Sequence, residues 1–169
     1  MTTATFPPSA RQAWLMALIL FAPLGIVFWL ILTASHDRAG AVAVGATLAG
    51  LLVVLYFILT RYSVAITPEQ LVVRHSIYTF KLARSEMKAV SARQVAASAD
   101  LGLVIRTNGV AGFGYLSGWF RRIGNEKTFC AVSQGPLWLL TFEGSAKCRQ
   151  LALSASPETI RSIEDWARQ

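Results

Sequence analysis

The chain has 169 residues, of which 54% are hydrophobic and only 15% are charged. Soluble domains usually carry about 25% charged residues, so this composition excludes an ordinary soluble domain and predicts that part of the chain lies in lipid. The net charge is nevertheless +7, and of the 16 basic residues only Arg11 and Arg38 precede Arg61. Apolar and basic residues are thus separated, which predicts a membrane anchor followed by a water-facing domain.

Two uncharged runs predict a transmembrane hairpin within residues 1–60. The first run covers residues 13–32, which as a helix is long enough to cross a hydrocarbon core of about 30 Å. The second run covers residues 39–60, and the short segment TASHDR joins the two. We expect helices at about 12–32 and 41–60. The alternative for the first run is a cleaved signal peptide with Arg11 as its basic region.

A strip of small residues on the second predicted helix is formed by Ala41, Gly45 and Ala49. Such a strip lets another helix approach closely, and its expected partner is the first helix, with a second copy of the chain as the alternative. Arg11 and Arg61 flank the two runs, whereas the connecting turn is nearly neutral. The positive-inside rule therefore places both termini in the cytoplasm.

Residues 61–169 form the second predicted domain, in which apolar and polar residues alternate as in β-strands. Strands are expected at about 62–66, 71–75, 78–82, 89–95 and 101–107, with a turn at Asn108 and Gly109, and then at 127–133, 137–142 and 148–153. A terminal helix is expected at about 157–168, with Ser156 as N-cap and Pro157 at its first position. Its apolar stripe, which must lie on the sheet, consists of Ile160, Ile163, Trp166 and Ala167.

Three segments carry a resemblance to bacterial membrane proteins with a pleckstrin-homology (PH-like) domain. They are RTNGVAGFGYLSGWFRR, LWLLTFEGS and LSASPETI, all between residues 106 and 160. The resemblance implies an α+β membrane protein, in which the two-helix hairpin precedes a PH-like β-barrel or sandwich of about seven strands with a C-terminal capping helix. It also implies the bacterial inner membrane as the location.

Catalytic motifs do not emerge from the sequence. His36 and His75 fall on opposite sides of the membrane in the predicted topology, and His75 is expected to be a partly buried, hydrogen-bonded strand residue. Cys130 and Cys148 lack the spacing of a metal site and are expected to be reduced thiols, with a disulfide between them as the alternative. No carboxylate pair suggests acid–base chemistry. We therefore expect a protein that is not an enzyme and that needs no cofactor or metal.

The segment from residue 112 to 127 is the strongest candidate for a binding site. Its glycines at 112, 114 and 118 superficially resemble a nucleotide-binding loop, but they lead towards a strand and not a helix, which argues against that function. Aromatic and basic side chains that suit lipid headgroups or a partner's peptide are interleaved with them: Phe113, Tyr115, Trp119, Phe120, Arg121, Arg122 and Lys127. The alternative is that the rings fill the core while the basic groups are solvated.

These features predict a membrane-anchored, non-catalytic interaction or scaffold module at the cytoplasmic face. Its expected partner is another protein, a second copy of itself or anionic lipid. The basic residues are dispersed over several strands, which argues against nucleic-acid binding. The alternative function is that of an accessory subunit in a membrane enzyme or transporter complex.

Overall fold

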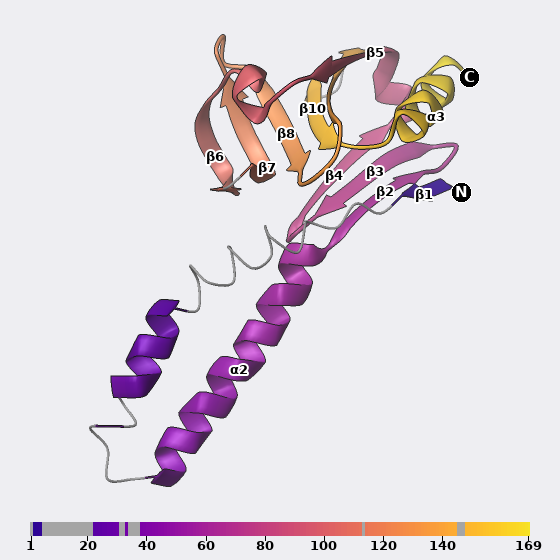
Figure 1. Cartoon of the computed structure of the whole chain (residues 1–169). Helices are drawn as coiled ribbons and strands as arrows, with labels where there is room; N and C mark the ends of the chain where they lie inside the picture. The colour runs from indigo at the N-terminus through magenta and orange to yellow at the C-terminus, as the bar shows by residue number, and fades with distance from the viewer. Residues whose placement is uncertain (1, 5–21, 31–32, 34–37, 113, 145–147) are drawn as a thin grey trace. The chain divides into compact units, whose positions relative to one another are not determined.

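The computed structural model describes residues 2–4, 22–30, 33, 38–112, 114–144 and 148–169 (Figure 1). The chain divides into two compact units. One comprises Met1–Pro8 together with Arg61–Gln169, and the other comprises Ser9–Thr60. The first of these holds the strands and the C-terminal helix, and the second is helical in its described part.

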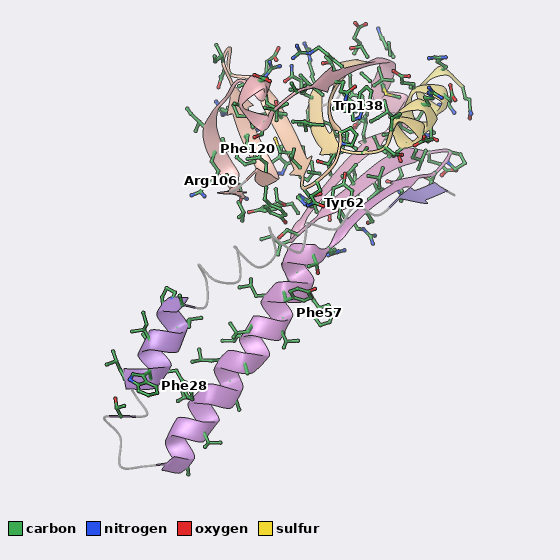
Figure 2. The ribbon with its side chains drawn as sticks, viewed as in Figure 1. Phe28, Phe57, Tyr62, Arg106, Phe120 and Trp138 are labelled. Atoms are coloured by element: carbon green, nitrogen blue, oxygen red, sulfur yellow. The ribbon has the colours of Figure 1, made fainter. Side chains whose placement is uncertain are left out.

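The helical unit contains a helical segment at 22–30 and the helix α2 (Arg38–Thr60). A Cβ atom added to Gly45 would lie 2.7 Å from the ring of Phe28, so the two helices approach closely at this glycine. Phe28 and Phe57 are labelled in Figure 2, and Phe57 points away from its helix with 67% of its surface exposed. Of the predicted small-residue strip, Gly45 thus faces the first helical segment, whereas the side chain of Ala41 lies outside the described residues and Ala49 carries no described contact.

The predicted transmembrane hairpin is corrected by the structure. Within the described residues, no helix is both long and apolar enough to count as a membrane span. Helix α2 covers the second predicted span at Arg38–Thr60, and the helical segment at 22–30 covers part of the first. A long apolar run predicts a helix, but it does not by itself make that helix a membrane span. The hairpin, and the description of the chain as a membrane protein that rests on it, is not retained.

The smaller sheet of the other unit has the strand order β1-β2-β3-β4 and is antiparallel throughout. Its strands are β1 (Thr2–Ala4), β2 (Tyr62–Ile66), β3 (Gln70–His75) and β4 (Tyr78–Ala83). The β3–β4 turn has Ser76 at φ 54°, a left-handed conformation that two-residue hairpins require. The expected strands from residue 62 to 82 are confirmed, and burial alternates clearly along β4, whereas β3 is buried at three successive residues.

The larger sheet has the strand order β5-β9-β10-β8-β7-β6. Two short 3₁₀ turns flank β5: Arg84–Glu86 precedes it and Ser98–Leu101 follows it. Its strands are β5 (Met87–Val95), β6 (Leu103–Gly112), β7 (Tyr115–Arg122), β8 (Lys127–Val132), β9 (Leu137–Gly144) and β10 (Gln150–Ser154). Strand β10 lies between β8 and β9, antiparallel to β9 but parallel to β8.

This arrangement also corrects the predicted PH-like layout of about seven strands. The described part of the chain has ten strands in two sheets, and the simple meander expected over residues 127–153 is interrupted. Sequence neighbours β8 and β9 do not pair, because β10 lies between them and hydrogen-bonds to both. The fold is mostly β, with a four-stranded and a six-stranded sheet.

Two apolar cores lie on opposite faces of the larger sheet. Alternate residues of its central strands divide between them: Phe129, Leu140 and Leu151 belong to the first core, which the smaller sheet also lines. Residues such as Cys130 and Ala152 belong to the second core. Because both faces are covered, β8 and β10 are buried almost continuously, as is typical of central strands.

Helix α3 (Pro157–Arg168) completes the first core beside β5 (Figure 1). The hydroxyl of its N-cap, Ser156, accepts a hydrogen bond from the backbone N–H of Thr159, as expected. Ile160, Ile163 and Trp166 are at most 4% exposed and join the core. Each such burial contributes about 1.5–3 kcal/mol, which fixes the helix on the sheet.

Candidate binding groove around Trp119

Trp119 lies on β7 at the opening between the two sheets. Its ring packs edge-on against Phe129, with a centroid distance of 5.1 Å, and lies 6.3 Å from the ring of Phe80 on β4. Its backbone carbonyl accepts a hydrogen bond of 2.9 Å from the hydroxyl of Thr107 on β6. The indole is only partly buried, because hollows open on both sides of it.

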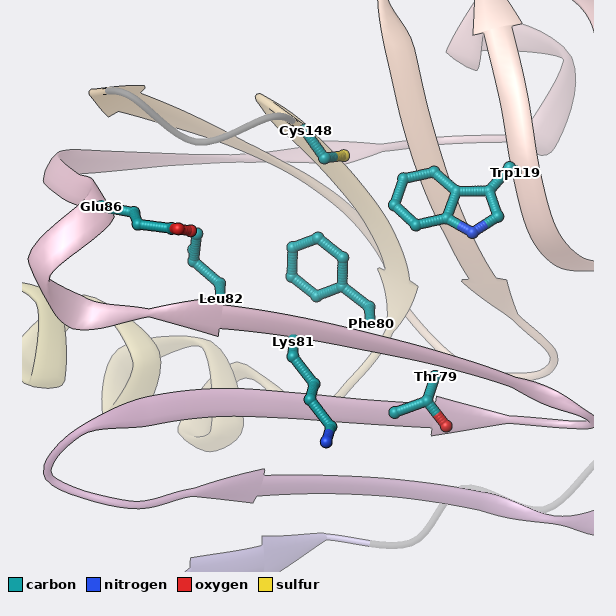
Figure 3. A pocket seen from close by; sticks show the side chains of 7 residues that line it. All are labelled: Thr79, Phe80, Lys81, Leu82, Glu86, Trp119 and Cys148. Carbon is teal, nitrogen blue, oxygen red and sulfur yellow. The ribbon is translucent and has the colours of Figure 1, made fainter.

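The first hollow has a volume of about 430 Å³ and lies between β4 and Trp119. Figure 3 shows Phe80, Trp119 and Cys148 around it, with β4 along its floor. Four consecutive β4 residues line it together with three residues from other segments: Thr79, Phe80, Lys81, Leu82, Glu86, Trp119 and Cys148.

The second hollow, also about 430 Å³, lies on the other side of the same indole. It shares Trp119 and Cys148 with the first and is otherwise lined by Thr107, Asn108, Arg121 and Lys127. We call the two hollows together the Trp119 groove, since one side chain separates them. A ligand that crosses the indole would contact both.

The charge of the Trp119 groove is predominantly positive. Arg121 and Lys127 line it, Lys81 borders it with its side chain on the outer face of β4 (Figure 3), and the single carboxylate of Glu86 opposes them. Within the described residues none of these three cations takes part in an ion pair, because both ion pairs there belong to Arg168 on α3. Arg121 does hydrogen-bond to the side-chain oxygen of Asn125. The groove therefore offers positive charge that is free to meet an acidic ligand.

Cys148 contributes a buried thiol to both hollows. Its Sγ donates to the carbonyl of Gln150 at 3.0 Å and lies 3.5 Å from that of Lys127. Burial raises the pKa of this thiol above its ordinary value, and hydrogen bonds and the charge of Lys127 only partly oppose the rise. Cys130 and Cys148 are both free, and burial raises the pKa of Cys130 as well. Protonated thiols are poor nucleophiles, so this cysteine serves as an apolar wall.

The predicted binding residues do not form one surface. Trp119, Arg121 and Lys127 border the Trp119 groove. Tyr115 is completely buried, and Phe120 is 4% exposed and belongs to the second core. Phe113 lies outside the described residues.

Arg122 makes hydrogen bonds that connect strands of the fold, whereas its neighbour Arg121 borders the Trp119 groove. The guanidinium of Arg122 donates to the backbone carbonyl of Leu101 at 2.6 Å and to the side-chain oxygen of Gln150 at 3.0 Å. These bonds tie β7 to the turn before β6 and to β10. The groove residues that sequence reasoning missed, Lys81 and Cys148, lie far from the glycine-rich segment in sequence and carry no local signal.

His75 lies in a buried aromatic cluster between Tyr62 and Tyr115, with ring centroids 5.1 Å and 4.7 Å away. The residue is fully buried, so the expectation of partial burial was wrong. Neither ring nitrogen makes a hydrogen bond of good geometry among the described residues. Burial lowers the pKa of His75 to about 4, and a weak backbone interaction with Leu116 opposes this only slightly. The imidazole is therefore neutral at physiological pH.

Metal binding has no support in the described part of the chain, where no three potential ligands cluster. In comparisons with known proteins, no family model, no curated protein and no solved structure matches this chain. The resemblance to PH-domain proteins stays a prediction from sequence.

Proposed function

We propose that this chain is a non-catalytic interaction module whose Trp119 groove binds a segment of a protein partner. The observation that carries the proposal is the partly exposed indole between two hollows of about 430 Å³ each, beside cations that form no ion pair with any described residue. Aromatic anchors beside cationic groups are typical of sites that carry most of the binding energy in protein interfaces.

The chemistry of the groove favours binding over catalysis. Its thiol is kept protonated by burial, and its single carboxylate, Glu86, has no histidine beside it among the lining residues. The neutral His75 is enclosed in the aromatic cluster and lines neither hollow. A nucleophile and a base within hydrogen-bonding reach, the usual minimum for covalent or acid–base catalysis, are not found together in the Trp119 groove.

The test is a titration of the full-length chain, labelled with ¹⁵N at its tryptophan indoles, with short acidic peptides, basic peptides of the same length and vesicles of anionic phospholipid. The Trp119→Phe variant identifies the signal of Trp119. We expect acidic peptides to shift that signal and Trp119→Ala to weaken their binding at least about tenfold, a loss of about 1.4 kcal/mol.

Arg161→Ser is the matched control, because Arg161 is an exposed cation on α3 that lines neither hollow. Its effect on affinity should be much smaller than that of Arg121→Ser. Equal binding by the Trp119→Ala variant would contradict the proposal, and so would binding to vesicles with no response to any peptide.

A further inference from the structure

We propose, building on the function proposed above, that the edge of β4 with which no described strand pairs takes up an extended acidic peptide as an additional strand. The peptide would lie in the first hollow, between β4 and Trp119. The main chain of β4 would then supply much of the binding energy, and side-chain pockets along the groove would supply the selectivity.

The backbone register shows which β4 groups are available. The β3–β4 hairpin closes with the pair His75 and Tyr78 around a two-residue turn, so this pair exchanges hydrogen bonds. Alternation along β4 then directs the N–H and C=O groups of Phe80 and Leu82 towards β3. The corresponding groups of Thr79 and Lys81 are directed towards the free edge.

Two backbone hydrogen bonds outside the regular strand pairing support this assignment of directions along β4. The backbone N–H of Arg84 donates to the carbonyl of Glu69 at 2.8 Å, which continues the inward series of Phe80 and Leu82. The N–H of Ser76 donates to the carbonyl of Arg61 at 2.9 Å, so Ser76, next to His75, is directed to β2 and not to β4. Both bonds agree with the alternation in which the backbone N–H and C=O groups of Thr79 and Lys81 point away from β3.

The first hollow lies along this edge. Thr79, Phe80, Lys81 and Leu82 all line it, and Figure 3 shows β4 as the outermost strand of its sheet, next to the space below Cys148 and Trp119. An edge strand with unpaired backbone groups is a template for another strand. The hollow supplies the room that such a strand needs.

The opposite edge of the same sheet already binds a separate extended segment. Strand β1, at Thr2–Ala4, pairs antiparallel with β2 although residues 5–61 separate the two strands along the chain. The smaller sheet thus accepts a short strand through main-chain pairing at one edge. Among the described strands, the edge formed by β4 is the one that stays unpaired in this sheet.

Charge and side-chain alternation specify the ligand. Phe80 and Leu82 face the core, so inward residues of an added strand would meet Trp119 and Phe80, which favours apolar side chains. Thr79 and Lys81 lie on the other face and are exposed, which favours a carboxylate opposite Lys81. Arg121 and Lys127 beyond the indole favour further acidic residues. The preferred peptide therefore alternates acidic and β-branched apolar residues.

The experiment measures backbone amide hydrogen exchange in the full-length chain with a synthetic peptide of alternating glutamate and valine, as long as β4. We expect exchange at Thr79 and Lys81 to slow at least about tenfold on binding, because their N–H groups acquire acceptors. The amides of Phe80 and Leu82 serve as internal controls, since β3 already protects them. A peptide with lysine in place of glutamate should bind far more weakly.

A pair of variants separates the contribution of the backbone N–H of Lys81 to peptide binding from that of its side-chain charge. Lys81→Gln removes only the charge, whereas Lys81→Pro also removes the outward N–H at a position where proline does not break the β3 ladder. We expect Lys81→Pro to bind the peptide at least about tenfold more weakly than Lys81→Gln. If Lys81→Pro fails to fold, the exchange measurement on the unmodified chain still decides.

The outcomes distinguish this inference from the proposed function. A shift of the Trp119 signal without slower exchange at Thr79 and Lys81 would overturn strand addition and leave the binding module intact. No response to any peptide would overturn both. If exchange at these amides is already slow without peptide, and slows further as the protein concentration rises, a second copy of the chain occupies the edge. That result would also overturn the inference.

Discussion

The aromatic cluster around His75 shows how a single side chain can couple folding to pH. In the folded chain the pKa of His75 is lowered to about 4, from an ordinary value of 6.5, because burial disfavours the charged imidazolium. His75 therefore binds a proton near pH 6.5 in the unfolded chain but only near pH 4 in the folded chain.

Stability should consequently fall as the pH is lowered from about 6.5 to about 4, and be independent of His75 above that window. The full difference amounts to about 3 kcal/mol, at 1.36 kcal/mol per pKa unit. His75→Phe keeps a ring between Tyr62 and Tyr115 but removes the titration, so its unfolding free energy should lose most of this pH dependence. Urea unfolding of both proteins between pH 4 and pH 7.5 measures the effect. An equally steep decline in the variant would contradict it.

Two facing glycines allow β6 and β7 to approach closely. Gly109 pairs with Gly118, which has φ +107°, and a Cβ on Gly118 would lie 2.5 Å from the backbone oxygen of Asn108. We expect Gly118→Ala to destabilise the fold by at least about 2 kcal/mol, because the clash is with backbone and the φ is unfavourable. The matched control is Gly112→Ala, whose Cβ would meet nothing within 4 Å. Chemical unfolding should show little change for the control, and equal losses would refute this explanation.

The same glycines explain why residue patterns misplaced a turn. Asn108 and Gly109 have the composition of a hairpin turn, yet both lie inside β6, opposite Trp119 and Gly118. A glycine selected for close strand approach and one selected for a turn look identical in sequence. Likewise, adjacent residues on a strand point to opposite faces, so Trp119 and Phe120 could not form one patch once β7 was a strand.

At the level of elements, local signals were sufficient for α3 and for most strands. Ser156 and Pro157 mark the helix start, and alternating apolar residues mark β2, β3 and β4. These signals depend on neighbours a few residues apart, which is why sequence alone could predict them. The apolar runs before residue 61 were different: the second run does form helix α2, but its apolar composition alone does not make that helix a membrane span.

The N-cap of α3 stabilises the start of this helix. Ser156→Ala removes the acceptor for the backbone N–H of Thr159 and should lower the unfolding free energy by about 1 kcal/mol. Ser162→Ala is the control, because its hydroxyl only bonds back to the carbonyl of Glu158 within the helix. That substitution should be neutral or slightly stabilising. Thermal unfolding of the two variants should separate them, and identical midpoints would count against the role of the cap.

For the whole molecule, the pairing of distant strands decides the architecture, and this pairing has no local signature. Nothing in residues 127–154 shows that β10 separates β8 from β9, since a plain meander satisfies the same alternation. The Trp119 groove likewise results from the pairing of strands that are distant in sequence. Its walls come from β4, β6, β7 and β8, and from Cys148, so only the assembled sheets bring its cations together.

The position of β10 in the larger sheet predicts how the fold responds to deletion. A chain ending at Gly144 lacks the strand that joins β8 to β9, together with α3, and should lose cooperative unfolding and dispersed amide signals. Deleting Thr2–Ala4 removes only a short edge strand and should preserve both. Circular dichroism and two-dimensional NMR of the two truncated chains provide the comparison. A folded sheet in the chain ending at Gly144 would show that both β10 and α3 are dispensable.

The order in which strands are made has a consequence during synthesis. The ribosome produces β8 and β9 before β10, and the ten residues from the end of β9 at Gly144 to the end of β10 at Ser154 take about 0.5–2 seconds to translate. Throughout that interval two apolar strands have exposed edges and no partner between them. A nascent chain paused there is a natural client for chaperones, and slow codons between these strands would prolong its exposure to aggregation.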